Sequence, residues 1–445
     1  MKRYIVTTLL SSILLCSGCI CREKPNLRIA VTSDAQAAAS ANHWGIVNTD
    51  KAFRFLAPFK PDVLIMPGDL AERFQPEVYD LYMASFLRNF KAKLPTQVAC
   101  AGNHDFWSRK NEDADTIWNE FTTRLKISRE NPCRQLIGGY DFITLSQKEI
   151  GEVPEDLLAQ LKIKLDEAVS RDSKKPVFLV THYPPSDTMY RSSGRYGQKN
   201  LRELLNKYPQ VISLSGHTHI PLNWERAFWQ GEFTALTCST LSYGCIGGGK
   251  FFNVAGGSIL PFAREVQQAM IIDIFDNKVK IHRYNIHDRK EIKSDSLWIV
   301  DIPYKSKAAA EIEKDLYARA LAPEFPQDAK LLIRNDFGFA YLLFPAAVHP
   351  QMVLGYVVKV QEKSSDGSWK TLNESEYVAD FYRYEKHRTS EVSVKLPENI
   401  FTVGRKLKFE VFPVEDFGKR GKSLTLEFTS PWKLTRSARQ EYPVE

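Results

Sequence analysis

The chain has 445 residues, of which 43% are hydrophobic and 12% aromatic, and this composition excludes an intrinsically disordered or fibrous protein. A chain of this length is too long for a single ordinary core, so we expect two domains. The formal net charge of +7 is a small excess for this size. We therefore expect no binding to a nucleic-acid polymer, whereas a small anionic substrate is compatible with the charge.

The N-terminus has the pattern of an export signal. Residues 2–3 are basic and residues 5–15 are apolar, a stretch too short to span a bilayer as a mature helix. With the small residues 17–18 before Cys19, residues 1–18 resemble a bacterial lipoprotein signal peptide, in which Cys19 becomes the lipidated first residue. Cys16 stands where that pattern usually has Leu, so an ordinary cleaved secretory peptide is the alternative. Both place the protein outside the cytoplasm, and the first anchors it to a bacterial membrane on the periplasmic or surface side.

Three of the seven cysteines lie at residues 16–21, and an oxidising compartment permits one or two disulfides among the other four. Sequence does not give the pairing, although Cys238 and Cys245 are close enough to be considered. Cys100 and Cys133 complete the set. Cys100 lies within an expected strand, which is more typical of a buried apolar residue than of a disulfide partner.

From residue 27 to about residue 208, apolar strand-like runs alternate with helical patterns. This alternation predicts an α/β fold in which helices flank a sheet. After His219 the sequence becomes rich in strands, and a turn at Asp276-Asn277 predicts a hairpin that closes a domain of residues 27–288. Strands are expected at 27–33, 62–66, 97–101, 139–145, 176–180, 210–215, 232–240, 269–275 and 279–285, and helices at 47–57, 76–92 and 155–169.

The remaining sequence has a different texture. Residues 289–325 are expected to form a linker with one charged helix, which ends before Pro323. In residues 326–432, short strands separated by turns predict an all-β sandwich domain. The stretches 353–361 and 407–423 resemble a fibronectin type III module, which implies a contact with a glycan or with another protein.

Residues that bind metals follow the expected strands of the first domain, in the strings SDAQ, PGDL, GNHD, THYPP and GHTH. Ligands of a parallel sheet gather where the strands end, so a single edge would bring these side chains together. An Asp between two divalent ions can give one oxygen to each, and two ions roughly 3.5–4 Å apart hold a phosphoryl group and activate water. The residues are Asp34, Asp69, Asn103, His104, His182, His217 and His219.

The order of these strings resembles that of the calcineurin-like metallophosphoesterase family, over about residues 27–285. The resemblance implies a four-layer fold, in which a sandwich of two sheets is flanked by helices. It also implies that a hydroxide bridging two metal ions attacks phosphorus, that His104 donates a proton to the leaving oxygen as general acid, and that Asp105 orients the His104 ring. The implied ligands are Asp34, Gln36, Asp69 and His219 for the first ion, and Asp69, Asn103, His182 and His217 for the second.

Gln36 departs from the family pattern, which usually has His in a DxH string. Because glutamine supplies a neutral and harder oxygen, we expect a preference for Mn²⁺, with Mg²⁺, Fe or Zn²⁺ as alternatives. A DxQ string is similar to that of a branch with manganese-dependent pyrophosphatases of ADP-ribose and CDP-alcohols. Purple acid phosphatases are disfavoured, because Glu72 stands where their GDxxY string has tyrosine.

Four further residues are candidates for contact with a small phosphorylated substrate. His43 follows the DxQ loop and Tyr183 stands in THYPP, while Arg191 and Arg195 lie in a loop that could hold a second phosphate. A packing or solvated-loop role is the alternative for each of them.

We therefore predict an exported, metal-dependent phosphoesterase, a hydrolase of phosphoester or phosphoanhydride bonds. One alternative is a pyrophosphohydrolase of ADP-ribose or CDP-alcohol type nucleotides, suggested by Gln36. Another is a catalytically silent surface binding protein, but a binding protein has no use for an acid such as His104.

Overall fold

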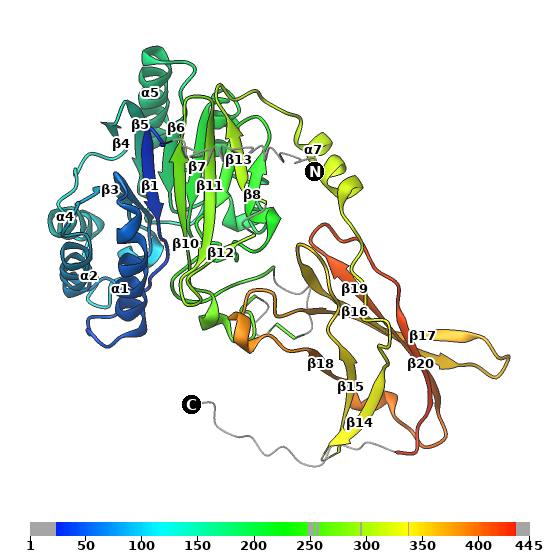
Figure 1. Ribbon diagram of the computed structural model, residues 1–445. Coiled ribbons are helices and arrows are strands. Elements are labelled where there is room, and N and C mark those ends of the chain that lie inside the picture. Colours follow the sequence, from blue (N-terminus) through cyan, green and yellow to red (C-terminus); the bar gives the residue numbers. More distant parts are fainter. Residues whose placement is uncertain (1–23, 248–252, 255–257, 294–295, 337, 433–445) are drawn as a thin grey trace, which may run out of the picture.

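The computed structural model describes residues 24–432, apart from 248–252, 255–257, 294–295 and 337 (Figure 1). The signal peptide predicted for residues 1–18 and the predicted lipidation of Cys19 lie outside the described residues. Within the described part of the chain, no helix is long and apolar enough to cross a membrane.

Two sheets form the first domain, and both are mixed. In the seven-stranded sheet the order is β12-β11-β10-β1-β2-β3, with β13 also paired to β11, and in the six-stranded sheet it is β4-β5-β6-β7-β9-β8. The first sheet contains β1 (Leu27–Val31), β2 (Val63–Pro67), β3 (Thr96–Cys100), β10 (Gln268–Ile274), β11 (Lys278–Asn285), β12 (Lys290–Ile292) and β13 (Trp298–Asp301). The second contains β4 (Cys133–Ile137), β5 (Tyr140–Leu145), β6 (Val177–Thr181), β7 (Val211–Ser215), β8 (Phe228–Gln230) and β9 (Thr234–Thr237).

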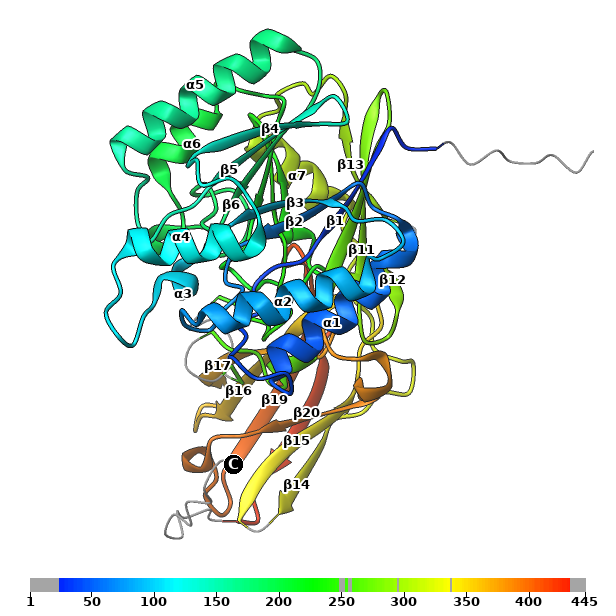
Figure 2. The same cartoon turned by 90° about the vertical axis from the view of Figure 1, so that its left-hand side faces the viewer.

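The two sheets pack face to face and are covered by helices on their outer faces. One core cluster joins Val31 and Ile65 of the first sheet to Phe178 and Leu214 of the second. The central strands are buried along their whole length because both of their faces are covered, which explains their continuous apolar sequence. Figure 2 shows the sheets between two groups of helices. These are α1 (Trp44–Leu56), α2 (Pro76–Asn89) and α4 (Ala114–Leu125) on one side, and α5 (Glu155–Arg171) and α6 (Lys199–Leu205) on the other.

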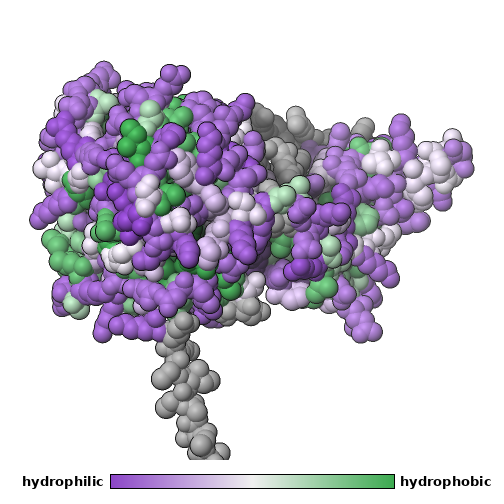
Figure 3. Space-filling view, turned by 90° about the horizontal axis from the view of Figure 1, so that it is seen from above, coloured by the Kyte–Doolittle hydropathy of each residue, from purple (hydrophilic) through white to green (hydrophobic). Residues whose placement is uncertain are grey.

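This architecture confirms the predicted α/β sandwich of two sheets flanked by helices. Strands β1, β2 and β3 run parallel in one sheet, and β5, β6 and β7 run parallel in the other. Five of these strands, β1, β2, β3, β6 and β7, end at Val31, Pro67, Cys100, Thr181 and Ser215. The loops that follow these ends carry the metal-binding strings. On the face seen in Figure 3, polar side chains predominate and apolar ones are scattered, as expected when most apolar residues are inside.

Two expectations are corrected in this domain. The stretch expected to begin a linker at residue 289 instead contains β12 and β13, which both pair with β11 and extend the seven-stranded sheet. No disulfide joins the four described cysteines, which are all free and buried. Cys100, as expected, packs as an apolar residue between the two sheets. The charged helix does occur, as α7 (Ala309–Arg319).

The C-terminal region is all-β, as predicted. Its core joins Phe344 and Tyr356 to Phe409 across two sheets. One sheet has the order β14-β15-β18 and the other β17-β16-β19-β20. The strands are β14 (Leu332–Asp336), β15 (Phe339–Pro345), β16 (Val353–Lys363), β17 (Trp369–Val378), β18 (Glu391–Lys395), β19 (Lys406–Glu415) and β20 (Leu424–Thr429).

The β-sandwich is packed against the first domain and shares core with it. Met352, Phe381 and Tyr382 belong to the same buried cluster as Leu260 and Val266 of the first domain. Apolar burial of this kind favours a fixed arrangement of domains over a flexible tether.

A buried carboxylate also crosses this interface. Asp416 accepts a hydrogen bond from the backbone N–H of Glu225 (2.8 Å), and its other oxygen is buried without a hydrogen-bond partner. The ammonium group of Lys293 lies 4.0 Å away but is closer to Glu225, at 2.9 Å. Burial raises the pKa of Asp416 to about 7, against the opposing effect of Lys293.

Asp416→Asn tests this assignment through the pH dependence of stability. The folded-state pKa lies above that of an exposed Asp, so the stability contributed by the protonated carboxyl is present at low pH and lost as pH rises through about 7. The wild-type thermal midpoint should therefore fall by a few degrees relative to Asp416→Asn between pH 5 and pH 8. Parallel midpoints over this range would contradict the raised pKa.

Candidate metal centre

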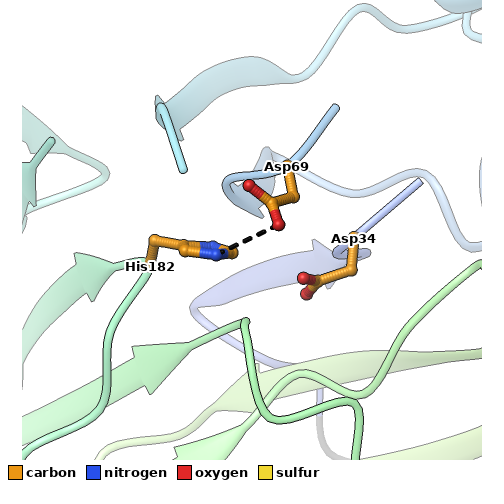
Figure 4. Close-up of side chains that lie close together, drawn as sticks. All are labelled: Asp34, Asp69 and His182. Atoms are coloured by element: carbon orange, nitrogen blue, oxygen red, sulfur yellow. Dashed lines mark ion pairs between the residues drawn. The ribbon is translucent and has the colours of Figure 1, made fainter. Parts of the chain in front are cut away.

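The predicted metal ligands converge at one edge of the sandwich. Asp34, Asp69 and His182 each offer a ligand atom, and these atoms lie within 4.8 Å of one another. Figure 4 shows the two carboxylates and the imidazole directed into the same space. His219 reaches Asp34, with Nε2 3.1 Å from Oδ1, and the rings of His182 and His217 have centroids 5.1 Å apart.

Asn103 and Gln36 extend this cluster. Asn103 is the first residue of α3 (Asn103–Phe106), and the backbone N–H of the next residue, His104, donates to Oδ1 of Asp69 (2.9 Å). The backbone N–H of Gln36 donates to the carbonyl oxygen of Asp69 (2.9 Å), which joins the first loop to the second. All seven predicted ligands therefore lie at this edge, Asn103 at the start of α3 and the other six on loops.

Backbone carbonyls orient two of the histidine rings. Nδ1 of His182 lies 2.8 Å from the carbonyl oxygen of Pro67, and Nδ1 of His219 lies 2.8 Å from that of Tyr243. Because a carbonyl oxygen only accepts, each Nδ1 carries a proton, and each ring presents the lone pair of Nε2 when it is neutral. These are the nitrogen atoms closest to Asp69 and Asp34, at 3.2 and 3.1 Å.

Several polar atoms here are buried without a hydrogen-bond partner, at a typical cost of about 1–3 kcal/mol each. They include Oδ1 of Asn103, Nε2 of His182, Nε2 of His217 and the amide nitrogen of Gln36. Together with two buried carboxylates, these oxygen and imidazole donors fit divalent metal ions, which would satisfy the unpaired atoms.

The backbone around the centre is strained. Non-glycine residues rarely adopt a positive φ, and each such residue costs of the order of 1 kcal/mol or more. Five of the predicted ligands do so: Asp34 (50°), Gln36 (43°), Asp69 (53°), His217 (63°) and His219 (53°). This concentration of strain in one cluster is typical of a functional site.

Two glycines allow the loops to approach so closely. A Cβ atom on Gly102 would lie 2.2 Å from Oδ1 of Asp69, and one on Gly216 would lie 2.6 Å from Oδ2 of Asp34. Neither contact is sterically allowed. The glycines of GNHD and GHTH are therefore required by packing beneath the carboxylates.

The electrostatics of the cluster favour cations. Burial opposes ionisation of Asp34 and Asp69, but the histidines beside them lower both carboxyl pKa values below the ordinary range. Burial likewise opposes a charge on His182, yet Asp69 raises the pKa of His182 to about 9. Burial and the neighbouring His182 lower the pKa of His217 well below normal, so this ring is neutral and can donate its lone pair.

His104 lies beside the cluster with a different environment. Its Nδ1 lies 2.9 Å from the carbonyl oxygen of Glu72, and 13% of its side chain is exposed. Its ring packs against that of Trp107, with 4.0 Å between centroids and 40° between the ring planes. The ring is thus fixed through Nδ1, while Nε2 lies 3.9 Å from Oδ2 of Asp69.

The predicted role of Asp105 is wrong. Its carboxylate accepts hydrogen bonds from the backbone N–H groups of Leu70 (3.3 Å), Ala71 (3.0 Å) and Gly102 (3.0 Å), and from the hydroxyl of Tyr79 (3.3 Å). It therefore clamps the GD loop to the GNHD loop, whereas the Glu72 carbonyl orients the His104 ring. Burial and the nearby Asp69 raise the pKa of Asp105 to about 6.

The four predicted substrate residues have different environments. Nδ1 of His43 accepts the N–H groups of Ala38 (3.1 Å) and Gly45 (3.2 Å), which caps α1, while the residue also lines a cavity. Tyr183 is buried behind the histidines, 4.9 Å from the ring of His217. Arg191 donates to the carbonyl of Thr218 (2.9 Å) beside the centre. Arg195 lies farther out.

Sequence reasoning missed two aromatic residues of the centre. Tyr196 lies beneath the guanidinium groups of Arg191 (4.8 Å) and Arg195 (4.9 Å), and its ring is 5.7 Å from that of His217. Hydrogen bonding to Arg195 lowers the pKa of Tyr196. The ring of Tyr243 packs against that of His219, with 4.5 Å between their centroids. The alternation of arginine and tyrosine in the loop was a signal for Tyr196, but no local signal marks Tyr243.

Comparison with known proteins gives weak likenesses to solved structures. No curated protein matches the chain. One solved structure with some likeness is a dimetal phosphatase from Danio rerio, with 9% identity and a TM-score of 0.44 over 63% of this chain and 100% of that chain. Another is a purple acid phosphatase from yellow lupin, with 14% identity and a TM-score of 0.43 over 65% of this chain and 56% of that chain. A third is GAP50, the anchor in the inner membrane complex of Plasmodium, with 14% identity and a TM-score of 0.41 over 66% of this chain and 95% of that chain. Likenesses with TM-scores below 0.5 are too weak to bear on function.

The family comparison is more specific. Residues 27–221 match the calcineurin-like phosphoesterase family, a range that contains all the predicted metal ligands and His104. Residues 27–221 therefore form a calcineurin-like phosphoesterase domain, which confirms the predicted class of enzyme, a hydrolase of phosphoesters.

Proposed function

We propose that the protein hydrolyses phosphoester or phosphoanhydride bonds of small substrates with two divalent metal ions. The observation that carries this proposal is the set of buried, unpartnered oxygen and imidazole donors around Asp34 and Asp69. The ions supply charge neutralisation for the phosphoryl group and activation of water when they are bound.

The distances between the histidine rings and the carboxylates divide the ligands into two groups. His219 lies next to Asp34, and His182 lies next to Asp69. We assign Asp34, Gln36 and His219 to one ion, and Asn103, His182 and His217 to the other. Asp69 is assigned to both, because its carboxylate lies between Asp34 and His182.

His104 is the proton donor in this proposal. Its Nδ1–H is held by the Glu72 carbonyl, so the transferable proton is carried on Nε2 when the ring is charged. The contact with Trp107 keeps the His104 ring in place. The partial exposure of His104 allows the proton to be replaced from solvent. The donor is needed because an alkoxide is a poor leaving group at neutral pH.

The hydrogen bonds around Gln36 support its role as an oxygen ligand. Oγ of Ser242 lies 3.0 Å from the amide oxygen of Gln36 and 2.8 Å from Oγ1 of Thr240, and Oγ1 of Thr240 lies 3.1 Å from the carbonyl oxygen of Asp34. Two hydroxyl protons cannot supply three hydrogen bonds. If the amide is turned over, its N–H donates to Ser242 and all three bonds are made.

The turned amide also places its oxygen where the unpaired N–H stood. An unpaired carbonyl oxygen can bind a cation, whereas an N–H group cannot. A neutral oxygen in place of the usual imidazole favours a harder ion, so we propose Mn²⁺ as the preferred metal, with Mg²⁺, Fe or Zn²⁺ as alternatives.

A pyrophosphohydrolase of ADP-ribose or CDP-alcohol type nucleotides is the second candidate. It is favoured by Arg191 and Tyr196, which lie beside His217 and could bind a second phosphate group. A silent surface binding protein is the least supported alternative, because His104 is positioned as an acid and not as a ligand.

We further propose that the mature protein is exported and anchored to a membrane through a lipid on Cys19. The C-terminal domain is proposed to be a fibronectin type III-like module, a view supported by its three-stranded and four-stranded sheets. Its exposed faces are proposed to contact a glycan or another protein.

The proposed activity is tested with the full mature chain loaded with Mn²⁺. Release of nitrophenol from its phosphate monoester and its bis-phosphodiester, and cleavage of ADP-ribose, should separate the three reaction types. Turnover should require the metal and should therefore stop when a chelator removes the metal from the site. Absence of turnover on all substrates with Mn²⁺, Mg²⁺, Fe²⁺ and Zn²⁺ would overturn the proposal.

Asp69→Asn should strip both ions, because one carboxylate is proposed to bind the two. The measurement is metal content of the purified protein by mass spectrometry, and it should fall from about two ions towards zero. Asp166→Asn, an exposed carboxylate on α5, is the matched control and should keep both ions. Loss of a single ion would contradict the shared ligand.

His104→Ala should lower turnover by roughly 10²–10⁴, the usual contribution of general acid catalysis. Metal content should stay near that of the wild type, because His104 is placed outside the ligand set. His282→Ala is the control, since His282 pairs with Glu291 on the outer part of the sheet. Loss of metal in His104→Ala would show that this residue is a ligand.

A further inference from the structure

A cavity of about 740 Å³ opens beside the metal centre, within the size range of small-molecule sites. It lies between the loop before α1 and a segment made by residues 259–265, which we call the 259–265 loop. Its lining residues are His43, Trp44, Glu72, Tyr243, Ile259, Leu260, Phe262, Ala263, Arg264 and Glu265.

Two lining residues connect this cavity to the chemistry. Tyr243 packs on the ring of His219 and supplies the carbonyl that holds it. Glu72 supplies the carbonyl that holds His104. One residue therefore separates the cavity from a proposed ligand, His219, and one from the proposed proton donor, His104. Because His104 protonates the leaving oxygen, the group attached to that oxygen lies on this side of the centre.

The chemistry of the walls favours an aromatic ring over an alkyl chain. Trp44, Tyr243 and Phe262 bring three rings to the cavity, and aromatic pairs gain free energy beyond simple apolar burial. The guanidinium of Arg264 lies 5.2 Å from the ring of Trp44. Glu72 also lines the cavity, with Oε2 3.7 Å from Nδ1 of His104, and an alkyl chain would desolvate its carboxylate without offering it a hydrogen bond. A flat ring with polar edges avoids this cost.

Phe262 has two unusual properties for a phenylalanine. Its side chain is 65% exposed and its φ is +52°, a conformation that costs free energy for a bulky residue. Neither burial nor backbone preference explains a phenylalanine at this position. An exposed ring held in a strained conformation beside a catalytic centre indicates a surface for a ligand.

The C-terminal domain holds this ring in place. The guanidinium of Arg383 lies 3.9 Å from the Phe262 ring and also pairs with Glu265 (2.9 Å). The hydroxyl of Tyr382 donates to the carbonyl of Pro261 (2.7 Å). The β-sandwich thus fixes the 259–265 loop, which is a wall of the cavity.

We propose that this cavity binds an aromatic ring in the leaving group of the substrate, and that Arg383 of the C-terminal domain positions Phe262 against that ring. This inference rests on the proposed phosphoesterase activity. Phe262 is the specificity residue, and Arg383 is a positioning residue that does not touch the substrate.

Phe262→Gly is the decisive variant, because glycine accepts the positive φ while the ring is removed. Its thermal midpoint should not fall, which separates loss of the ring from loss of folding. The full Mn²⁺-loaded chain is assayed with phenyl phosphate, a nucleoside 5′-monophosphate, hexyl phosphate and ethyl phosphate. We expect KM for the ring-bearing esters to rise about 5–10-fold, the effect of an aromatic contact worth roughly 1–1.4 kcal/mol. Ethyl and hexyl phosphate should change less than about twofold.

Arg383→Ala should change KM in the same direction with a smaller effect, because Phe262 loses its support. Arg420→Ala, an exposed arginine of the same domain paired with Glu374, is the control and should leave KM unchanged. If Phe262→Gly raises KM more for the nucleotide than for phenyl phosphate, the bound ring is a nucleobase. If it raises KM more for phenyl phosphate, the bound ring is that of a simple aryl ester. Either result supports the proposal.

Binding of phenylphosphonate and ethylphosphonate, measured by calorimetry, separates this inference from the activity on which it rests. If no ester is hydrolysed, the proposed function fails, but Phe262→Gly should still weaken phenylphosphonate alone. The ring-binding inference is overturned if Phe262→Gly affects all ligands equally, or if hexyl phosphate loses as much as phenyl phosphate.

Discussion

Two ionised carboxylates buried at one edge of the sandwich are the constraint on which the rest of the first domain depends. Asp34 and Asp69 are 0% and 1% exposed, and such burial is costly unless opposite charge is supplied. Against the effect of burial, His219 beside Asp34 and His182 beside Asp69 lower the pKa values of the two carboxyl groups. The strained ligand backbones and the clamp made by Asp105 all hold groups against these two carboxylates, where divalent ions would complete the neutralisation.

The same constraint explains why the proposed metal ligands come from loops that follow so many strands. A single loop cannot surround a cation pair with seven side chains, but the carboxyl ends of parallel strands in two packed sheets can. The central strands of each sheet are buried on both faces, so their ends are fixed within the core and hold the loops that follow them. Precise placement of ligands therefore follows from packing.

The C-terminal domain is coupled to this centre through packing and charge. It shares buried apolar residues with the first domain, and Arg383 and Tyr382 reach the 259–265 loop beside the metal ligands. Asp416 adds a buried carboxylate at a second place in the same interface. An appended module of this kind can shape access to a catalytic site without supplying a ligand.

The sequence alone determined the α/β class, the all-β C-terminal region and the ligand strings, because strand periodicity and the residues that follow strand ends are local features. Tertiary structure alone decided the rest. Glu72 orients His104 through a backbone carbonyl, for which no side-chain pattern exists, and Asp105 turned out to bind backbone N–H groups. Strands β12 and β13 were taken for a linker because their short runs acquire meaning only when they pair with β11. The cavity joins residues 43 to 265, a contact that only the folded chain creates.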